Sequence, residues 1–349
     1  MTDTVPPRIL VCIGWPYAKT STHVGQVAGA YLPGDIFARY HRHAGHTVLM
    51  VSGSDAHGTP ITYDADKLGI SPKELAESFH RQIVEVFGRL GLSFDLYTIT
   101  TTENHYHVTQ QVFLQLLEHG YIFRETTLAP YCPTDKRFLP DRYINGTCPH
   151  CGFTDARGDQ CDNCGRTLDP DQLIDPRCRI CGSVDSKIEM RPSEHFFLDL
   201  PKLQDRLGAW LDTHNDDWRP AVIKFAQTWI RDGLKPRAIT RDLDWGVPIP
   251  LPGFDDKRIY VWFDAVIGYL SASIEWAEKQ GTPDAWKDFW VPDAEGNPPS
   301  RSYYFIGKDN IPFHTIIWPA ILMGHGDLAL PWDVPANEYM TMSGSKASS

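Results

Sequence analysis

Several features that would place this chain in a common class are missing from its sequence. Neither the dinucleotide-binding pattern G-x-G-x-x-G nor the phosphate-binding pattern G-x-x-x-x-G-K-[ST] occurs, so both sites lack their main sequence support. The first apolar run, Ile9–Ile13, ends at Gly14 and is too short for a secretory signal or a membrane span. We therefore expect a cytoplasmic protein that has no membrane partner.

Positive charge is also scarce. The 349 residues include 33 basic and 44 acidic side chains, which leaves a net charge of −11. A protein that bound nucleic acid over its whole surface would have the opposite balance. Any contact with a polynucleotide must therefore be confined to a local basic groove. The length leaves room for more than one compact unit.

Short β-rich runs alternate with helical stretches in the first part of the chain. Ile9–Ile13 and Thr47–Val51 are typical of strands. Between them, Val24–Tyr31 and Asp35–His43 are predicted as two helices separated at Pro33-Gly34. Alternation of this kind predicts an α/β fold, in which helices cover a parallel sheet.

A different composition begins near Thr126 and continues to Pro192. Seven of the eight cysteines lie in this segment, among glycine, proline and aspartate. After it the alternation of strand and helix returns, for example at Ile259–Phe263 and Tyr303–Ile306. We predict a nucleotide-type α/β domain split by an inserted module. Its first half is residues 1–125, the insertion is 126–192 within a domain that extends to about 240, and the second half is 241–349.

Four cysteines in the insertion have the spacing of a metal site. They lie in the segment CPHCGFTDARGDQCDNCG, as Cys148-x2-Cys151-x9-Cys161-x2-Cys164. Two C-x-x-C hairpins suit tetrahedral zinc, and four protein ligands make a structural site rather than a catalytic one. A disulfide framework is the alternative, although the chain shows no secretory signal. A redox C-x-x-C would be a single pair beside a βαβ unit.

A second set of possible ligands surrounds the first. It consists of Cys132, Asp135, Cys178 and Cys181. If the hairpins nest, these four residues face one another, with Asp135 in the position where a fourth cysteine is expected. Carboxylate oxygen also binds zinc, so a site with three sulfur ligands and one oxygen ligand is a second prediction.

The segment TSTHVGQ (residues 20–26) follows the first predicted strand and precedes a helix. Backbone N–H groups at such a helix N-terminus favour an anion, and the histidine can donate to phosphate oxygens. An ordinary surface turn is the alternative that this segment alone leaves open.

Several separated stretches together resemble one family. GWPYAKTSTHVGQ is similar to the HIGH signature of class I aminoacyl-tRNA synthetases. GSDAHGTPI, YVWFDAVIGY and YFIGKDNIPFHTIIWPA resemble the catalytic blocks of methionyl-tRNA synthetases, and the terminal MTMSGSKASS resembles the start of their KMSKS loop. The resemblance runs from about Ile9 to the last residue. It implies a Rossmann-like (HUP-type) parallel sheet split by a zinc-knuckle connective domain.

The resemblance also implies roles for single residues. ATP would be bound by His23, Gly25, Gln26, Gly307, Lys308, Asp309 and Lys346. Of these, all but the two glycines would take part in catalysis, with Lys346 neutralising charge on the leaving pyrophosphate. The methionine would be bound by Trp15 (through its backbone), Tyr17, Asp55, Trp262, Ala265, Tyr269 and His314. Asp55 would hold the α-ammonium group. The rings suit a thioether, which offers little to hydrogen-bond and is recognised by shape and by sulfur–aromatic contacts.

Three departures from the family pattern stand out. Gln26 replaces the last histidine of HIGH, so the side chain keeps a donor but has no charge. Val266 replaces a frequent proline. Ser349 occupies the position of the second KMSKS lysine and is the last residue. The helical anticodon-binding domain is not part of this sequence, so anticodon contacts are expected only from sequence that is missing here.

The resemblance implies a methionine–tRNA ligase that uses ATP with Mg²⁺, L-methionine and the acceptor end of tRNA-Met. One alternative is a paralogue that activates methionine or a related amino acid for another acceptor. The other is a zinc-stabilised binding module without catalysis. Methionine-dependent exchange of ATP with pyrophosphate, by a chain extending past the KMSKS-like loop, separates the first two from the third.

Overall fold

A computed structural model describes residues 8–158, 161, 163–164, 168, 170–182, 188–338, 340–342 and 345–346. Its centre is a five-stranded sheet in the order β14-β13-β1-β2-β3, in which every pairing is parallel. The strands are β1 (Arg8–Ile13), β2 (Val48–Ser54), β3 (Leu96–Ile99), β13 (Ser300–Gly307) and β14 (Ala336–Asn337). Strands from both ends of the chain therefore share one sheet. The predicted fold class, a parallel α/β sheet split by an insertion, is confirmed.

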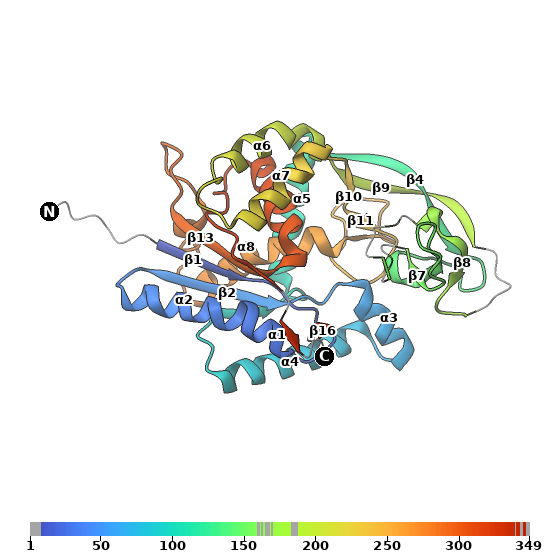
Figure 1. Cartoon of the computed structure of the whole chain (residues 1–349), viewed down its shortest axis with the longest axis horizontal. Helices are drawn as coiled ribbons and strands as arrows, with labels where there is room; N and C mark the ends of the chain where they lie inside the picture. The colour runs from blue at the N-terminus through green and yellow to red at the C-terminus, as the bar shows by residue number, and fades with distance from the viewer. Residues whose placement is uncertain are drawn as a thin grey trace.

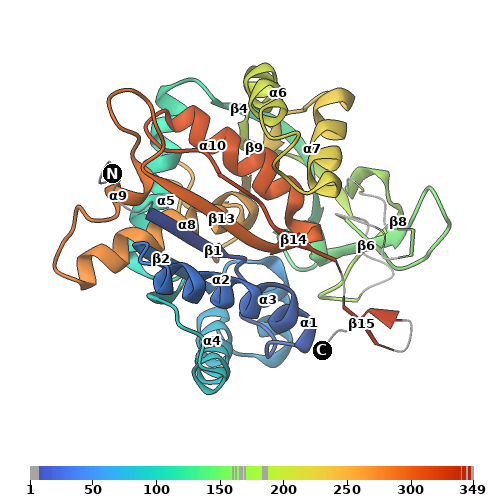
Figure 2. The same cartoon turned by 60° about the vertical axis from the view of Figure 1, so that its left-hand side comes forward.

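Helices cover both faces of this sheet (Figures 1 and 2). On one face Ile9, Val11 and Ile13 pack with residues of α2 (Leu32–His43) and α4 (Pro72–Leu90). On the other face Leu10 and Cys12 join the large core formed with three helices: α5 (Glu103–Glu118), α8 (Val261–Lys279) and α10 (Trp318–His325). Successive side chains of a strand point to opposite faces, so a strand covered on both sides is apolar throughout.

The helix after β1 differs from the prediction. α1 (Val24–Gln26), the π-helical η1 (Val27–Tyr31) and α2 follow one another without a break, so the prediction of two separate helices was wrong. The N–H of Leu32 bonds to the carbonyl of Val27, five residues back, and Pro33 follows. Because proline cannot donate a hydrogen bond, a wider π turn lets the helix continue through it.

The same arrangement recurs after β13. There η5 (Lys308–Asn310) and the π-helical η6 (Phe313–Ile317) lead into α10, whose second residue is Pro319. The N–H of Trp318 bonds to the carbonyl of Phe313, again five residues back. The connections after β1 and after β13, which carry the predicted ATP residues, therefore both lead into a π turn.

The cysteine-rich segment lies away from the sheet, at the end of a long antiparallel pair (Figure 1). That pair is β4 (Ile122–Cys132) and β9 (Glu189–Leu198), with β5 and β10 at its edges. The remaining elements are α3 (Thr59–Leu68), β5 (Arg137–Phe138), η2 (Asp141–Tyr143), β6 (Ile144–Thr147), β7 (Ala156–Arg157), η3 (Pro170–Gln172), β8 (Ile174–Cys178), η4 (Leu200–Leu203), α6 (Gln204–Asp212), α7 (Pro220–Asp232), β10 (Arg237–Ala238), β11 (Thr240–Arg241), β12 (Arg258–Ile259), α9 (Lys287–Trp290), β15 (Thr341–Met342) and β16 (Ser345–Lys346). Among the described residues, every helix is too short or too polar to cross a bilayer.

Candidate functional site

The strand order contains a switch point between β1 and β13. From β1 the chain proceeds to β2 and β3 on one side, whereas β13 and β14 lie on the other. In open parallel sheets, ligands bind at the carboxyl ends of strands on either side of such a point. His23 follows β1, and Lys308 follows β13 directly. The structure thus has a place for a ligand where both predicted ATP motifs emerge.

The two motifs are connected through β14. Gly29, in η1, is so close to Asn337 that a Cβ at Gly29 would lie 2.2 Å from the Asn337 amide nitrogen. Asn337 in turn is the register partner of Gly307, the last residue of β13. The helix that begins at His23 therefore lies beside the end of the strand that leads to Lys308.

His23 and Gln26 cap the helix that starts after the turn. The N–H of Gln26 donates to Nδ1 of His23 at 3.3 Å, and the N–H of His23 donates to Oε1 of Gln26 at 3.1 Å. This reciprocal capping box uses the oxygen of the Gln26 side chain and leaves its amide nitrogen outside the cap. Gly25 lies between them in α1 and is half-buried.

Lys308 and Asp309 lie in η5, with Asp309 exposed. Nζ of Lys308 forms an ion pair with Oε2 of Glu338 at 2.6 Å, and the Glu338 side chain is 73% exposed. Sequence reasoning missed Glu338, which no motif marks. The side chain of Lys346 and all of Ser349 lie outside the described residues, so the prediction for Lys346 stays a prediction.

Asp55 lies between the ends of β1 and β2. Its N–H donates to the carbonyl of Pro16, and its own carbonyl accepts from the N–H of Ala18, both at 2.8 Å. The side chain is buried, and its Oδ1 accepts from the N–H of His57 at 3.1 Å. Burial raises the pKa of Asp55 and the nearby Asp264 raises it further, whereas the His57 N–H lowers it. A cation that reached this carboxyl would therefore favour its charged form.

The predicted aromatic residues come together beside Asp55. Trp15 makes an edge contact with Tyr269 at a centroid distance of 6.3 Å, and Tyr17 makes one with Trp262, also at 6.3 Å. Oη of Tyr269 lies 2.8 Å from Nε2 of His314. Ala265 lies on α8 one turn before Tyr269 and is half-buried.

Two glycines make room for the Trp15 ring. A Cβ at Gly53 would lie 2.2 Å from the Trp15 ring, and one at Gly268 would lie 2.7 Å from it. Sequence reasoning also missed Phe313, which stacks on Trp262 at 4.0 Å with the planes only 7° apart. Its place next to His314 in the quoted block was the signal that could have identified it.

A buried hydrogen-bonded chain behind Asp55 was also missed. Nδ1 of His57 lies 2.7 Å from Oδ2 of Asp264, and Nε2 of His57 lies 3.2 Å from Oη of Tyr106. His57 and Asp264 are 207 positions apart. The ligand atoms of His57, Asp264 and His105 are also close enough for a metal ion. Nδ1 of His105, however, lies 2.8 Å from the Ser271 hydroxyl, so the group is part of a hydrogen-bond network.

Both predicted sets of zinc ligands come together. In each set the four ligand atoms lie within 4.8 Å of one another. Sulfur pairs are separated by 4.0 Å (Cys148–Cys164), 3.6 Å (Cys151–Cys161) and 3.8 Å (Cys132–Cys181). These distances exceed a disulfide bond of about 2.05 Å. They match the separation of about 3.8 Å between sulfurs at the corners of a tetrahedron with zinc–sulfur bonds of about 2.3 Å. Either set could hold a metal ion.

Backbone geometry supports Asp135 as the fourth ligand of the outer set. Gly152 and Gly182, each following the second cysteine of a hairpin, have φ of 74° and 61°. Lys136 stands in the same position after Asp135 and also has a positive φ, 54°. Oδ2 of Asp135 lies 2.9 Å from Sγ of Cys178. The segment from Cys132 therefore has the turn of its glycine-containing counterparts, with a carboxylate in place of the last sulfur.

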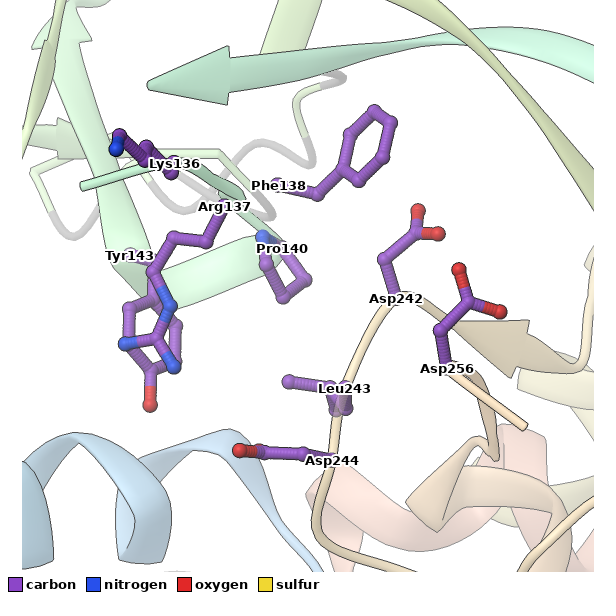
Figure 3. A pocket seen from close by; sticks show the side chains of 9 residues that line it. All are labelled: Lys136, Arg137, Phe138, Pro140, Tyr143, Asp242, Leu243, Asp244 and Asp256. Atoms are coloured by element: carbon purple, nitrogen blue, oxygen red, sulfur yellow. The ribbon is translucent and has the colours of Figure 1, made fainter. Parts of the chain in front are cut away.

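A cavity of about 220 Å³ lies between the insertion and the loop before α8 (Figure 3). It is lined by Lys136, Arg137, Phe138, Pro140, Tyr143, Asp242, Leu243, Asp244 and Asp256. None of these is a predicted ATP or methionine residue.

The family model described as tRNA synthetases class I (M) matches residues 9–349. A methionine–tRNA ligase of Roseiflexus sp. (strain RS-1) is 58% identical over 347 residues, which cover 99% of this chain and 58% of that protein. One of Thermomicrobium roseum is 55% identical over 345 residues, with 99% and 58% covered. This chain therefore spans less than two thirds of the length of these relatives.

A crystal structure of Mycobacterium tuberculosis methionyl-tRNA synthetase bound by methionyl-adenylate has the same fold. Its TM-score is 0.70 at 24% sequence identity, and the match covers 99% of this chain and 59% of that one.

Proposed function

The chain belongs to the family of class I tRNA synthetases (M), and we propose that it contains the catalytic region of a methionine–tRNA ligase. It would activate L-methionine with ATP and transfer it to tRNA-Met. The observation that carries this proposal is the ring cluster around Trp15, Trp262 and Tyr269. It lies beside a buried carboxylate, Asp55, at the switch point of a parallel sheet. The names of the relatives and the methionyl-adenylate in the similar structure support the same activity.

ATP would lie across the carboxyl ends of β1 and β13. The helix that begins after His23 directs N–H groups and the positive end of its dipole toward this edge, which suits phosphate. Lys308 would exchange its exposed partner Glu338 for a phosphate oxygen, and Gly307 allows close approach of the nucleotide. Mg²⁺ accompanying ATP would supply further positive charge on the phosphates.

Methionine would bind with its ammonium group on Asp55 and its side chain among the rings. A thioether is discriminated by shape and by sulfur–aromatic contacts of about 0.3–1.5 kcal/mol each. The Trp262 ring stacks on Phe313 on one side and makes an edge contact with Tyr17. A methionine side chain that enters between Tyr17 and Trp262 would therefore require these two rings to move apart.

The reaction needs positioning more than covalent help. An oxygen of the methionine carboxylate would attack the α-phosphorus while the bond from that phosphorus to the bridging oxygen breaks. Methionyl-adenylate forms and pyrophosphate leaves with the electron pair. Cations at Lys308 and Lys346 would stabilise the charge on the departing group, as in other phosphoryl transfers.

Both cysteine sets would hold structural zinc. Four protein ligands leave no open position for substrate in either set. The backbone N–H groups of His150 and Ile180 donate to Sγ of Cys148 and Cys178, each at 3.4 Å, and such donors stabilise thiolates.

Methionine binding is the first test. Titration of the purified chain with L-methionine, followed by calorimetry and tryptophan fluorescence, should show binding to one site. Trp262→Ala should weaken it at least tenfold. Trp332→Ala, an exposed tryptophan outside the cluster, is the matched control and should leave binding unchanged. Equal affinity in both variants would contradict the proposed pocket.

Catalysis is the second test. Methionine-dependent exchange of pyrophosphate into ATP, by the chain continued past Ser349, distinguishes a synthetase from a non-catalytic module. Charging of tRNA-Met then separates the ligase from a paralogue that serves another acceptor. Exchange without charging would favour the paralogue.

A further inference from the structure

Two buried carboxyl groups meet behind the ring cluster. Asp55 is 4% exposed and comes from the end of β2, and Asp264 is 0% exposed and lies in the first turn of α8. His57 links them, because its backbone N–H donates to Oδ1 of Asp55 and its ring lies 2.7 Å from Oδ2 of Asp264. Two buried carboxylates linked through one histidine, away from water, are unfavourable when both are charged unless a cation compensates them.

One oxygen of this pair lacks a partner. Oδ1 of Asp264 is buried and has no hydrogen-bond partner among the described residues. A buried acceptor in this state is destabilising, and more so if it is charged. The neighbouring residues Trp262 and Ala265, on the same turn of α8, belong to the predicted methionine site. The unpaired oxygen is short of a donor, and its carboxyl is linked through His57 to Asp55, the predicted ligand of the ammonium group.

The two hydrogen bonds that join Tyr106, His57 and Asp264 allow two arrangements of their protons. In one, Asp264 is ionised, Nδ1–H of His57 donates to it, and the Tyr106 hydroxyl donates to Nε2. In the other, Asp264 is protonated and donates to Nδ1, and Nε2–H donates to Tyr106. Burial lowers the pKa of His57 to about 3, so its ring is neutral in both. Tyr106 is only partly buried, which gives the chain an end near solvent.

Titratable groups face Asp264 from two elements. Asp55 and His57 face it from the loop after β2, and His105 and Tyr106 from α5. Burial raises the pKa of Asp264, and burial raises the pKa of Tyr106 to about 12. Burial lowers the pKa of His105. This environment disfavours a second negative charge.

Two arginines lie on the strands before α8. Arg258 acts on Tyr106 and lowers its pKa, and the Arg241 guanidinium lies 3.8 Å over the ring of Tyr260.

We propose that Asp264 is a second ligand for the α-ammonium group of the amino acid, and that binding of this group displaces one proton from the Asp55–Asp264 pair. The inference rests on the proposed function. Without ligand, the two carboxyls hold one proton and one negative charge. The ammonium arrives with three N–H donors and one positive charge, both carboxylates accept from it, and the displaced proton leaves through His57 and Tyr106. Charge is balanced on both sides of the step.

Proton release can be counted directly. We would titrate L-methionine into the protein by calorimetry at pH 6.5, in buffers with different ionisation enthalpies, such as phosphate and imidazole. The slope of binding enthalpy against buffer enthalpy is expected to show release of 0.5–1 proton per methionine, following the coupled titration of such pairs. Methioninol, which keeps the ammonium but lacks the carboxylate, should release the same number. The α-hydroxy analogue, which lacks the ammonium, should release none.

The variants separate a ligand from a structural residue. Asp264→Asn should abolish release and flatten the pH dependence of the dissociation constant, which in the parent falls as pH rises, by up to about tenfold per pH unit while the free pair holds its proton. Glu275→Gln is the matched control. Glu275 is a buried carboxyl on the same helix whose partners are Thr98 and Lys279, and this variant should keep both properties.

Methionine binding without dependence on the buffer overturns the inference and leaves the proposed function standing. Absence of methionine binding by the parent overturns both. If Asp264→Asn does not fold, the comparison of methioninol with the hydroxy analogue on the parent still decides, because equal release by the two contradicts displacement by the ammonium.

Discussion

The hydrogen bond between Tyr269 and His314 offers a sharp test of the ring cluster. Nδ1 of His314 lies 2.9 Å from the carbonyl of Asn310, so Nδ1 must carry the proton and Nε2 must accept. The Tyr269 hydroxyl, 2.8 Å from Nε2, is then the donor. Burial lowers the pKa of His314 to about 4, so the ring is neutral near pH 7.

Tyr269→Phe removes this donor and leaves almost the same volume. Tyr269 is 1% exposed and His314 is 4% exposed, so water cannot replace the hydroxyl at Nε2 of His314 without a rearrangement. An unsatisfied buried acceptor costs about 1–3 kcal/mol. For 349 residues, an unfolding entropy of about 2.1 cal/mol/K per residue converts a loss of about 2 kcal/mol into a fall in Tm of roughly 3 °C.

Urea denaturation at pH 7.5 measures this loss, with Tyr40→Phe as the matched control. Tyr40 is 67% exposed, and its variant should stay within about 0.5 kcal/mol of the parent. The affinity for methionine should also fall in Tyr269→Phe and not in the control. A double variant with His314→Leu should cost less than the sum of the single changes, since the two residues share one bond. Equal stability of the two tyrosine variants would refute the reasoning.

Three further predictions concern the metal sites, the proposed ATP site and the pH dependence of stability. Asp135→Asn should lower the zinc content from two ions per chain to one, whereas Asp135→Cys should keep two. Elemental analysis of unchelated protein counts the ions, and two ions in Asp135→Asn would exclude the carboxylate as a ligand. Lys308→Met should reduce the rate of methionine-dependent exchange about a hundredfold or more. Glu338→Gln is the control, and it should change the free energy of unfolding by less than about 0.5 kcal/mol because the ion pair is exposed. Equal exchange rates in the two variants would exclude the role of Lys308. The pKa of His314 is about 4 in the folded chain and about 6.5 unfolded, so the unfolded state binds an extra proton between these values. The stabilisation is therefore complete above pH 6.5 and lost as pH falls toward 4, and His314→Gln should remove about one proton from the slope of unfolding free energy against pH; an unchanged slope would contradict the assignment.

Local patterns carried much of the fold prediction. The apolar run Ile9–Ile13 predicted a strand, and it is buried on both faces as a parallel strand requires. The cysteine spacing predicted two ligand sets, and the structure brings together both, including Asp135. A strand and a single C-x-x-C hairpin depend on residues a few positions apart, which is why the sequence indicates them, whereas zinc binding by the two sets stays a prediction.

The predicted helix break at Pro33 shows a limit of predictions from local sequence. Proline usually interrupts a helix, but here η1 supplies a π turn and α2 continues. Ala30, Tyr31 and Ala38 on both sides of the turn pack into one core cluster with β1. Tertiary packing of this kind stabilises a continuous helix that propensity alone would divide.

The sequence by itself determined which residue types were available: the rings, the carboxylates, the sulfur ligands and the motifs that mark a synthetase. Only the tertiary structure decided which of them meet. The pairing of His57 with Asp264 spans 207 positions, Glu338 reaches Lys308 from the residue after β14, and Trp15 occupies the space that Gly53 and Gly268 leave open. No local pattern encodes such contacts, because they arise when distant segments fold against one sheet and exclude water from the groups between them.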